Sequence, residues 1–342
     1  MTIADDAPAS MTFEQWRQQA GGTVRFFSLG RHALVEALKV AGVGPGDAVL
    51  LPDFICRDVL ASLHALGARP AWYAVDESLA PAVQQDAWPA ARAVVAVNYF
   101  GFPQRLDPFR TYAARTGAVL VEDNAHGFLS RDDHGQWLGT RTEIGIFSLR
   151  KSLLLADGAM IRCGTNGFAD RLSAPLAEHG GGYAPAVAVK ARLRRLPVGG
   201  PQIAKAATTA IRLLRQWRSG TAVPDDDAEA ERVVPAPAAP HLGLQRELAA
   251  FDPEAEIARR RNAYADVEAF ARRYRIRPLF PALGDATVPY GFAFRADDAG
   301  RQTMQGWAAR RGFDVISWPA LPDEIAGRVP DALRDIRLVN FL

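Results

Sequence analysis

Residues 24–163 alternate amphipathic segments with short apolar runs that end at Gly, Pro or Asp. This alternation is typical of βαβ units, in which helices connect the parallel strands of one sheet. The spacing predicts helices at 31–42, 56–67 and 106–117, and strands at 48–52, 70–75, 92–100, 118–123, 143–149 and 159–163. We therefore expect an α/β domain with a mainly parallel central sheet flanked by helices.

The rest of the chain has a different pattern of apolar and polar residues. From 254 onward an amphipathic helix, a strand at 287–294, a helix at 299–311 and a strand at 313–319 predict a smaller α+β domain. The predicted division is a main α/β domain over 1–180, a basic helical segment with an Asp-, Pro- and Ala-rich linker over 181–250, and the small domain over 251–342.

The basic stretch at 190–218 carries Leu213, Leu214 and Trp217 on helical spacing. Two interpretations remain open. Such a helix can contact a membrane surface or an anionic partner, or it can pack on the main domain with its charges in solvent, which is the commoner outcome.

Composition excludes several classes of protein. Of the 342 residues 49% are hydrophobic and 23% are charged, which argues against an overall disordered, collagen-like or integral membrane chain. The net charge of +2, from 40 basic and 38 acidic residues, does not indicate a nucleic-acid partner. The two cysteines form no C-x-x-C pair, the first residues lack the features of a signal peptide, and no apolar run could span a bilayer. We therefore expect a cytoplasmic protein.

Three short segments carry groups suited to chemistry. Asp123 ends a predicted strand, where open α/β sheets place their ligand-binding groups. Ser148, Arg150 and Lys151 bring a hydroxyl, a guanidinium and an amine into one turn that suits a phosphate. Gly30 directly precedes a helix, whose first N–H groups favour an anion. The chain has only four lysines, at positions 39, 151, 190 and 205, so chemistry that needs an amine has four candidates.

These segments occur in the order found in a known family. SLGRHAL (28–34), GVGPGDAVLLPDF (42–54), GARPAWYAVD (67–76), VNYFG (97–101), VLVEDNAH (119–126) and LGTRTEIGIFSLRKSLLLADGAMI (138–161) are similar to its motifs. The chain thus resembles the DegT/DnrJ/EryC1/StrS sugar aminotransferases over residues 25–163, and only faintly beyond 240. The resemblance implies the aspartate-aminotransferase fold (fold type I) and the cofactor pyridoxal 5'-phosphate (PLP).

The resemblance also implies roles for individual residues. Lys151 would form the internal Schiff base with the cofactor. Asp123 would pair with the pyridinium nitrogen and keep it protonated. His126 would lie beside the cofactor ring and bond its phenolic oxygen. The phosphate would be held by Gly30, Arg31, His32 and Ser148. No metal ion is implied.

The chain departs from the family pattern at several positions. Arg31 stands where the family has threonine, and the ring-stacking aromatic falls at Cys56, with Phe54 nearby. The spacing from Ser148 to Lys151 is three residues rather than five. The glycine-rich stretch after the lysine is ADGA, the family's Asn-x-Arg segment is not found, and the small domain is expected to be shortened.

The resemblance predicts an aminotransferase that moves an amino group, from glutamate, to a keto-sugar nucleotide in cell-surface polysaccharide or secondary-metabolite biosynthesis. A homodimer is expected, since the family builds its cofactor sites at a two-fold interface. Two alternatives remain: a PLP enzyme that acts on a non-sugar ketone or aldehyde, and a catalytically degenerate member that serves as a partner or scaffold protein. The dehydratase branch is disfavoured because it replaces the lysine with histidine, whereas this chain retains Lys151.

Overall fold

The computed structural model describes residues 11–82, 85–153, 155–164, 167–180 and 228–341, together with scattered positions between 189 and 210. The predicted contacts of Leu213, Leu214 and Trp217 lie outside the described residues. Within the described part of the chain, no helix is long and apolar enough to cross a membrane.

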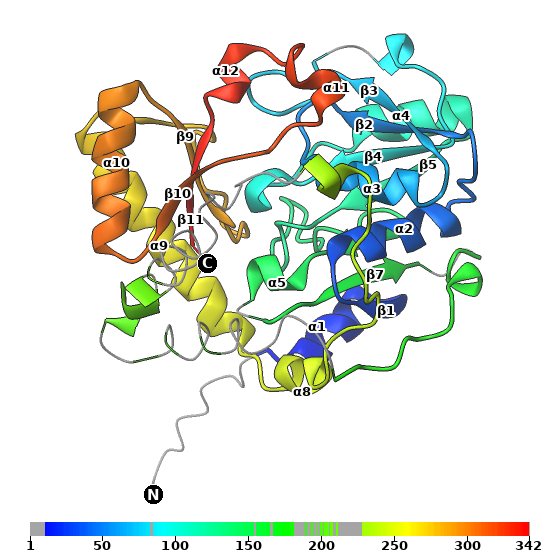
Figure 1. The fold of residues 1–342 in the computed structure, drawn as a ribbon, viewed down its shortest axis with the longest axis horizontal. Coiled ribbons are helices and arrows are strands. Elements are labelled where there is room, and N and C mark those ends of the chain that lie inside the picture. Colours follow the sequence, from blue (N-terminus) through cyan, green and yellow to red (C-terminus); the bar gives the residue numbers. More distant parts are fainter. Residues whose placement is uncertain are drawn as a thin grey trace, which may run out of the picture.

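A seven-stranded sheet forms the larger part of the molecule (Figure 1), and its strand order is β1-β7-β6-β5-β4-β2-β3. The pairs among β2 to β6 are parallel, whereas β7 runs antiparallel to both β6 and β1. The strands are β1 (Thr23–Phe27), β2 (Ala48–Pro52), β3 (Arg69–Tyr73), β4 (Ala93–Val97), β5 (Val119–Asp123), β6 (Ile144–Phe147) and β7 (Ala159–Cys163). The predicted mainly parallel sheet is confirmed.

Apolar sequence runs become the centre of this sheet. Every residue of β2 (AVLLP) and of β4 (AVVAV) is buried, which is the pattern of strands covered on both faces. The large-domain helices are α1 (Phe13–Ala20), α2 (Gly30–Val40), α3 (Asp58–His64), α4 (Asp107–Thr116) and α5 (Leu149–Ser152). Helix α2 packs on β6 and β7, and α4 packs on β4 and β5. Gly117 ends α4 in the left-handed conformation (φ 74°), as its sequence position predicts.

The C-terminal part forms a second, antiparallel sheet with the order β10-β11-β9-β8, and this confirms the predicted α+β unit. Its strands are β8 (Arg277–Pro278), β9 (Gly291–Arg295), β10 (Asp314–Ser317) and β11 (Arg337–Asn340). Helix α8 (Leu244–Ala249) leads into this part. Its own helices are α9 (Pro253–Arg273), α10 (Asp298–Arg310), α11 (Asp323–Ala326) and α12 (Asp331–Arg334). Asp252 caps α9 by accepting the Ala255 N–H at 3.1 Å.

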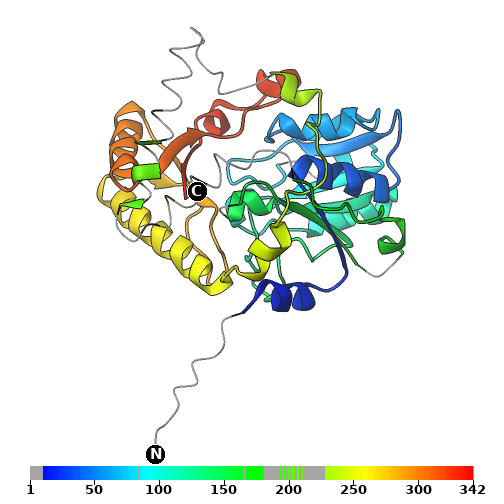
Figure 2. The ribbon, with the colours of Figure 1, turned by 60° about the horizontal axis from the view of Figure 1, so that its bottom comes forward.

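Two segments from beyond residue 228 return to the large sheet and border the same region. Ala238 accepts the backbone N–H of Ser28 at 2.9 Å, so the connecting segment lies on the turn between β1 and α2. The short helix η4 (Ala228–Glu231) lies against the chain that leads into α11 (Figure 2). Arg57 contacts both, because its guanidinium lies 3.4 Å from Glu231 and 2.6 Å from Asp323.

Candidate functional site

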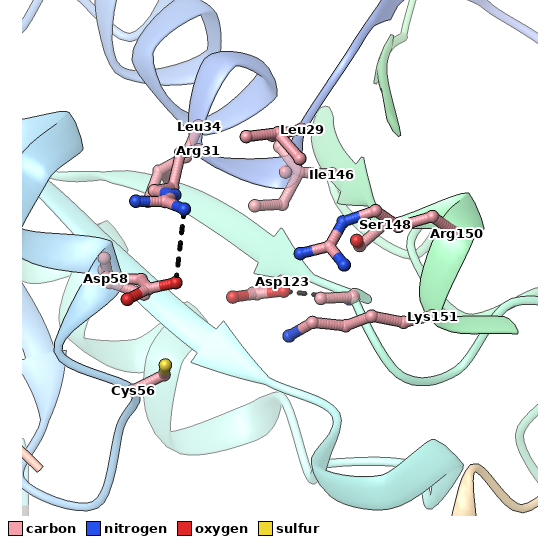
Figure 3. Close-up of a pocket in the computed structure, with 13 residues that line it drawn as sticks. Leu29, Arg31, Leu34, Cys56, Asp58, Asp123, Ile146, Ser148, Arg150 and Lys151 are labelled. Atoms are coloured by element: carbon pink, nitrogen blue, oxygen red, sulfur yellow. Dashed lines mark hydrogen bonds and ion pairs between the residues drawn. The ribbon is translucent and has the colours of Figure 1, made fainter. Parts of the chain in front are cut away.

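A cavity opens at the carboxyl ends of β5 and β6, beside the start of α2 and beside α5 (Figure 3). It encloses about 510 Å³ of empty space, including its opening to solvent. The position is the one that open α/β sheets use for ligands. The residues that line it are Leu29, Gly30, Arg31, Leu34, Cys56, Asp58, Val59, Asp123, Ala125, Ile146, Ser148, Arg150 and Lys151.

Asp123 is the last residue of β5 and presents a buried carboxylate to the cavity. Its Oδ1 accepts the backbone N–H of Ala125 at 2.9 Å, which fixes the orientation of the side chain. Burial raises the pKa of Asp123, and the Ala125 N–H and the charge of Lys151 offset this only in part. The carboxylate is therefore poorly solvated and lacks a full counter-charge.

Lys151 lies on the one-turn helix α5, where its backbone N–H donates to the Ser148 carbonyl at 3.0 Å. Burial lowers the pKa of the Lys151 ammonium group, and the nearby charge of Arg150 acts in the same direction. Neither Lys151 nor Asp123 forms an ion pair with any described residue, although both line one cavity. The arrangement leaves space between an amine and a carboxylate.

His126 does not line the cavity but contacts its lysine. Its Nε2 lies 3.4 Å from Lys151 Nζ. The imidazole is stacked between Phe100 (centroids 5.7 Å apart) and Tyr290 (4.5 Å), with Trp318 edge-on at 4.9 Å. Burial holds the pKa of His126 well below its usual value, so the ring is neutral and Nε2 can accept a hydrogen bond from the lysine.

Three of the four residues expected at the phosphate lie together in the cavity. Gly30, Arg31 and Ser148 line the cavity, whereas His32 does not. The His32 ring lies 2.8 Å from the Pro235 carbonyl, and its backbone N–H donates to the Leu29 carbonyl at 3.0 Å. The Nε2 atom and the backbone N–H of His32 are thus engaged within the protein, and we leave His32 out of the proposed phosphate-binding set.

The start of α2 and Ser148 form one corner of the cavity. A Cβ atom on Gly30 would lie 3.5 Å from the Ser148 Cβ, so the two backbones approach closely. Arg31, the next residue of α2, pairs with Asp58 of α3, with Nη2 and Oδ2 3.5 Å apart (Figure 3). Sequence analysis missed Asp58 and the apolar lining residues, because a carboxylate in the first turn of a helix is usually an ordinary capping charge.

Cys56 faces the same cavity. Burial raises the pKa of its thiol, and the Asp58 carboxylate adds to the rise, so the sulfur is present as a neutral thiol. A small thiol in this wall leaves more room than an aromatic side chain would.

Sequence and structure comparisons agree with this geometry. Residues 24–182 match the model of the DegT/DnrJ/EryC1/StrS aminotransferase family. Over this stretch the chain is similar to that family. The matched residues include the whole seven-stranded sheet except the first residue of β1.

Solved structures share the fold over most of the chain. The DesV protein of S. venezuelae, in complex with a ketimine intermediate, is 19% identical, with 96% of this chain and 82% of that chain covered and a TM-score of 0.59. The E. coli GDP-4-keto-6-deoxy-D-mannose-3-dehydratase with bound hydrated PLP is 16% identical, with 96% and 85% covered and a TM-score of 0.61. A GDP-4-keto-6-deoxymannose-3-dehydratase with a trapped PLP-glutamate geminal diamine is also 16% identical, with 97% and 88% covered and a TM-score of 0.60.

The match over residues 24–182 bears out the predicted resemblance to the PLP-dependent aminotransferases of this family, and the structural neighbours confirm the predicted type I fold. The residues present fit the cofactor. Among the described residues, Asp123 is a buried carboxylate that forms no ion pair, Lys151 is a half-buried amine, and the Nε of Arg150 is buried without a hydrogen-bond partner. A ligand with a protonated ring nitrogen, a carbonyl carbon and an anionic group would satisfy all three.

Proposed function

We propose that this protein transfers an amino group from glutamate to a keto-sugar nucleotide, with PLP held between Lys151 and Asp123. The observation that carries the proposal is that the two side chains face one cavity without pairing with each other (Figure 3). The amine and the carboxylate are therefore available for a molecule between them.

PLP supplies a carbonyl carbon that bonds to amines and a ring that withdraws electrons from the adjacent carbon. Lys151 Nζ is the group that would hold it. Because burial lowers the pKa of Lys151, a larger share of its Nζ is neutral at physiological pH, and a neutral amine can accept a proton from the α-carbon of an amino acid.

Two further residues support these roles. Asp123 would keep a proton on the ring nitrogen, since a carboxylate that lacks a counter-charge stabilises a cation placed beside it. His126 Nε2 would orient the lysine through the 3.4 Å contact with Nζ. The aromatic rings on both faces of His126 fix the direction of that contact.

Neighbours of the same fold support the substrate classes. The name of the E. coli dehydratase contains a GDP-linked keto sugar, and the second dehydratase holds a trapped PLP-glutamate geminal diamine. We propose the same two classes for this chain, in cell-surface polysaccharide or secondary-metabolite biosynthesis.

We also propose a cytoplasmic homodimer with a main domain over 1–180, a connecting part over 181–250 and a small domain over 251–342. The two sheets fall within the first and third parts, and Cys56 and Cys163 are free thiols, as is usual in a reducing compartment. Light scattering during size-exclusion chromatography tests the dimer.

Cofactor attachment is the first test. Purified protein is incubated with PLP, reduced with borohydride and digested, and the labelled peptide is identified by mass spectrometry. We expect a visible absorption band before reduction and a label on Lys151. Lys39→Ala is the matched control, because Lys39 lies exposed on α2 outside the cavity. Label on Lys39, or none on Lys151, would refute the proposal.

Substrate class is the second test. The PLP-loaded protein is mixed with glutamate and a panel of keto-sugar nucleotides, and 2-oxoglutarate and amino-sugar products are measured. Lys151→Ala should abolish both products. If Lys151 is labelled but non-sugar ketones alone are aminated, the cofactor assignment stands and the sugar assignment fails.

A further inference from the structure

Arg150 is a half-buried residue of the cavity whose buried Nε atom has no partner in the described chain. Its backbone N–H donates to the Gly158 carbonyl at 3.0 Å, so the residue is held in place by its main chain. Its side chain lines the cavity, yet the buried Nε has no hydrogen-bond partner among the described residues. An unsatisfied buried donor is costly, so a ligand that accepted a hydrogen bond from Nε would stabilise this part of the cavity.

Two arginines of the described chain with almost fully buried side chains have a different environment. Arg141 is paired with Glu122 at 2.6 Å and also donates to the Gln104 carbonyl. Arg260 is paired with Glu256 at 2.6 Å and donates to the Ser152 carbonyl at 2.5 Å. Where a buried arginine has a structural role in this fold, carboxylates and carbonyls surround it, and Arg150 does not follow that pattern.

The surroundings of Arg150 favour an anion. In Figure 3 its guanidinium lies beside Ser148 and extends over the cavity toward Asp123. Ser148 in turn is packed against Gly30, the first residue of the eleven-residue helix α2. A hydroxyl, the N-terminal end of a helix dipole and an unpaired guanidinium thus share one corner.

Arg31 is less suited to the same ligand. Its guanidinium is the partner of Asp58, which neutralises it and places a carboxylate on that side of the cavity. An incoming dianion would therefore meet less repulsion at the Arg150 corner than at the Arg31 side.

We propose that Arg150, together with Ser148 and the start of α2, binds the phosphate group of the cofactor. The assignment rests on the proposed function, and it adds to that function a residue that gives the site its preference for a phosphorylated over a phosphate-free pyridoxal. A guanidinium can donate two parallel hydrogen bonds to a phosphate, which an amine cannot.

The test compares the affinities of the apoprotein for pyridoxal phosphate and for pyridoxal, measured by the change in visible absorption or by calorimetry. We expect Arg150→Gln to reduce the preference for pyridoxal phosphate by about ten- to one-hundred-fold, the range for a lost hydrogen bond to a charged group, and to leave pyridoxal affinity unchanged. Arg150→Lys should keep part of the preference, because it retains the charge. Arg31→Gln is the matched control and should have a smaller effect.

A second measurement guards against a variant that fails to fold. Inorganic phosphate should compete with pyridoxal phosphate in the wild-type protein, and this competition should weaken in Arg150→Lys. An unchanged preference in Arg150→Gln, combined with a raised KM for glutamate, would overturn the proposal, since Arg150 would then bind the donor's carboxylate. Equal wild-type affinity for both pyridoxals would also overturn it, while leaving the proposed function intact. If the wild-type protein binds neither, the proposed function itself fails.

Discussion

Replacing Asp123 with asparagine should weaken the function and stabilise the apoprotein at the same time. The carboxylate is buried, and only the Ala125 N–H and the charge of Lys151 offset its desolvation. Asparagine keeps an oxygen for the Ala125 N–H but removes the charge. Removing a buried charge that has no ion-pair partner among the described residues should raise the unfolding free energy at neutral pH by an amount on the order of 1–2 kcal/mol.

The pH dependence gives the sign of this effect. The folded-state pKa of Asp123 lies above its unfolded value, so the unfolded chain releases this proton first. Stability of the wild-type apoprotein therefore falls as pH rises from the ordinary aspartate range to the raised pKa. In Asp123→Asn that fall is absent, and the two proteins should have equal stability only below the ordinary aspartate pKa.

Two assays together check the reasoning. Thermal unfolding of the apoproteins should give a higher Tm for Asp123→Asn than for the wild type. This difference in Tm should grow as the pH rises from acidic to neutral. Cofactor titration and turnover should show the opposite ranking, with activity lower by ~10²–10³-fold, the usual effect of removing one group that stabilises charge at a reacting centre. If Asp123→Asn loses both stability and cofactor binding, the reasoning is refuted, because the buried charge of Asp123 would then not lower the stability of the apoprotein.

Three further changes test other parts of the structure. Arg260→Met should lower the unfolding free energy by about 3–5 kcal/mol, because it strands the groups paired with this buried guanidinium, and an unchanged Tm would contradict this. Burial alone would lower the pKa of His241, but hydrogen bonds to carboxylates, including Asp157 at 2.7 Å, raise it. The unfolding free energy should therefore decrease as the pH rises above the ordinary histidine range through the raised pKa. Asp157→Asn should flatten that part of a profile of Tm against pH. His126→Phe preserves the ring stack but removes the acceptor for Lys151, so covalent capture of PLP in stopped-flow absorbance should slow by roughly fivefold, with no slowing arguing against an orienting role.

The sequence predicted those helices and strands whose own residues show a clear hydrophobic period. The run AVLLP became β2, and the amphipathic segment after Asp252 became α9. Sequence analysis missed β1 and β11, which are short and only partly buried, and β8, which has two residues. Strand β11 exists because β9 and β10 flank it on both sides, and such non-local pairing leaves little trace in a four-residue segment.

The site shows the same division between local and long-range information. Asp123 and Lys151 could be found because Asp123 ends β5 and Lys151 follows β6, and these neighbouring parallel strands end at one edge of the sheet. The surroundings of His126 could not be found, because Tyr290 and Trp318 come from the far end of the chain. These two rings set the orientation of His126, and His126 in turn contacts Lys151 Nζ. The C-terminal part of the chain therefore contributes to the position of the amine on which the proposed reaction depends, although every group that lines the cavity comes from the first 151 residues.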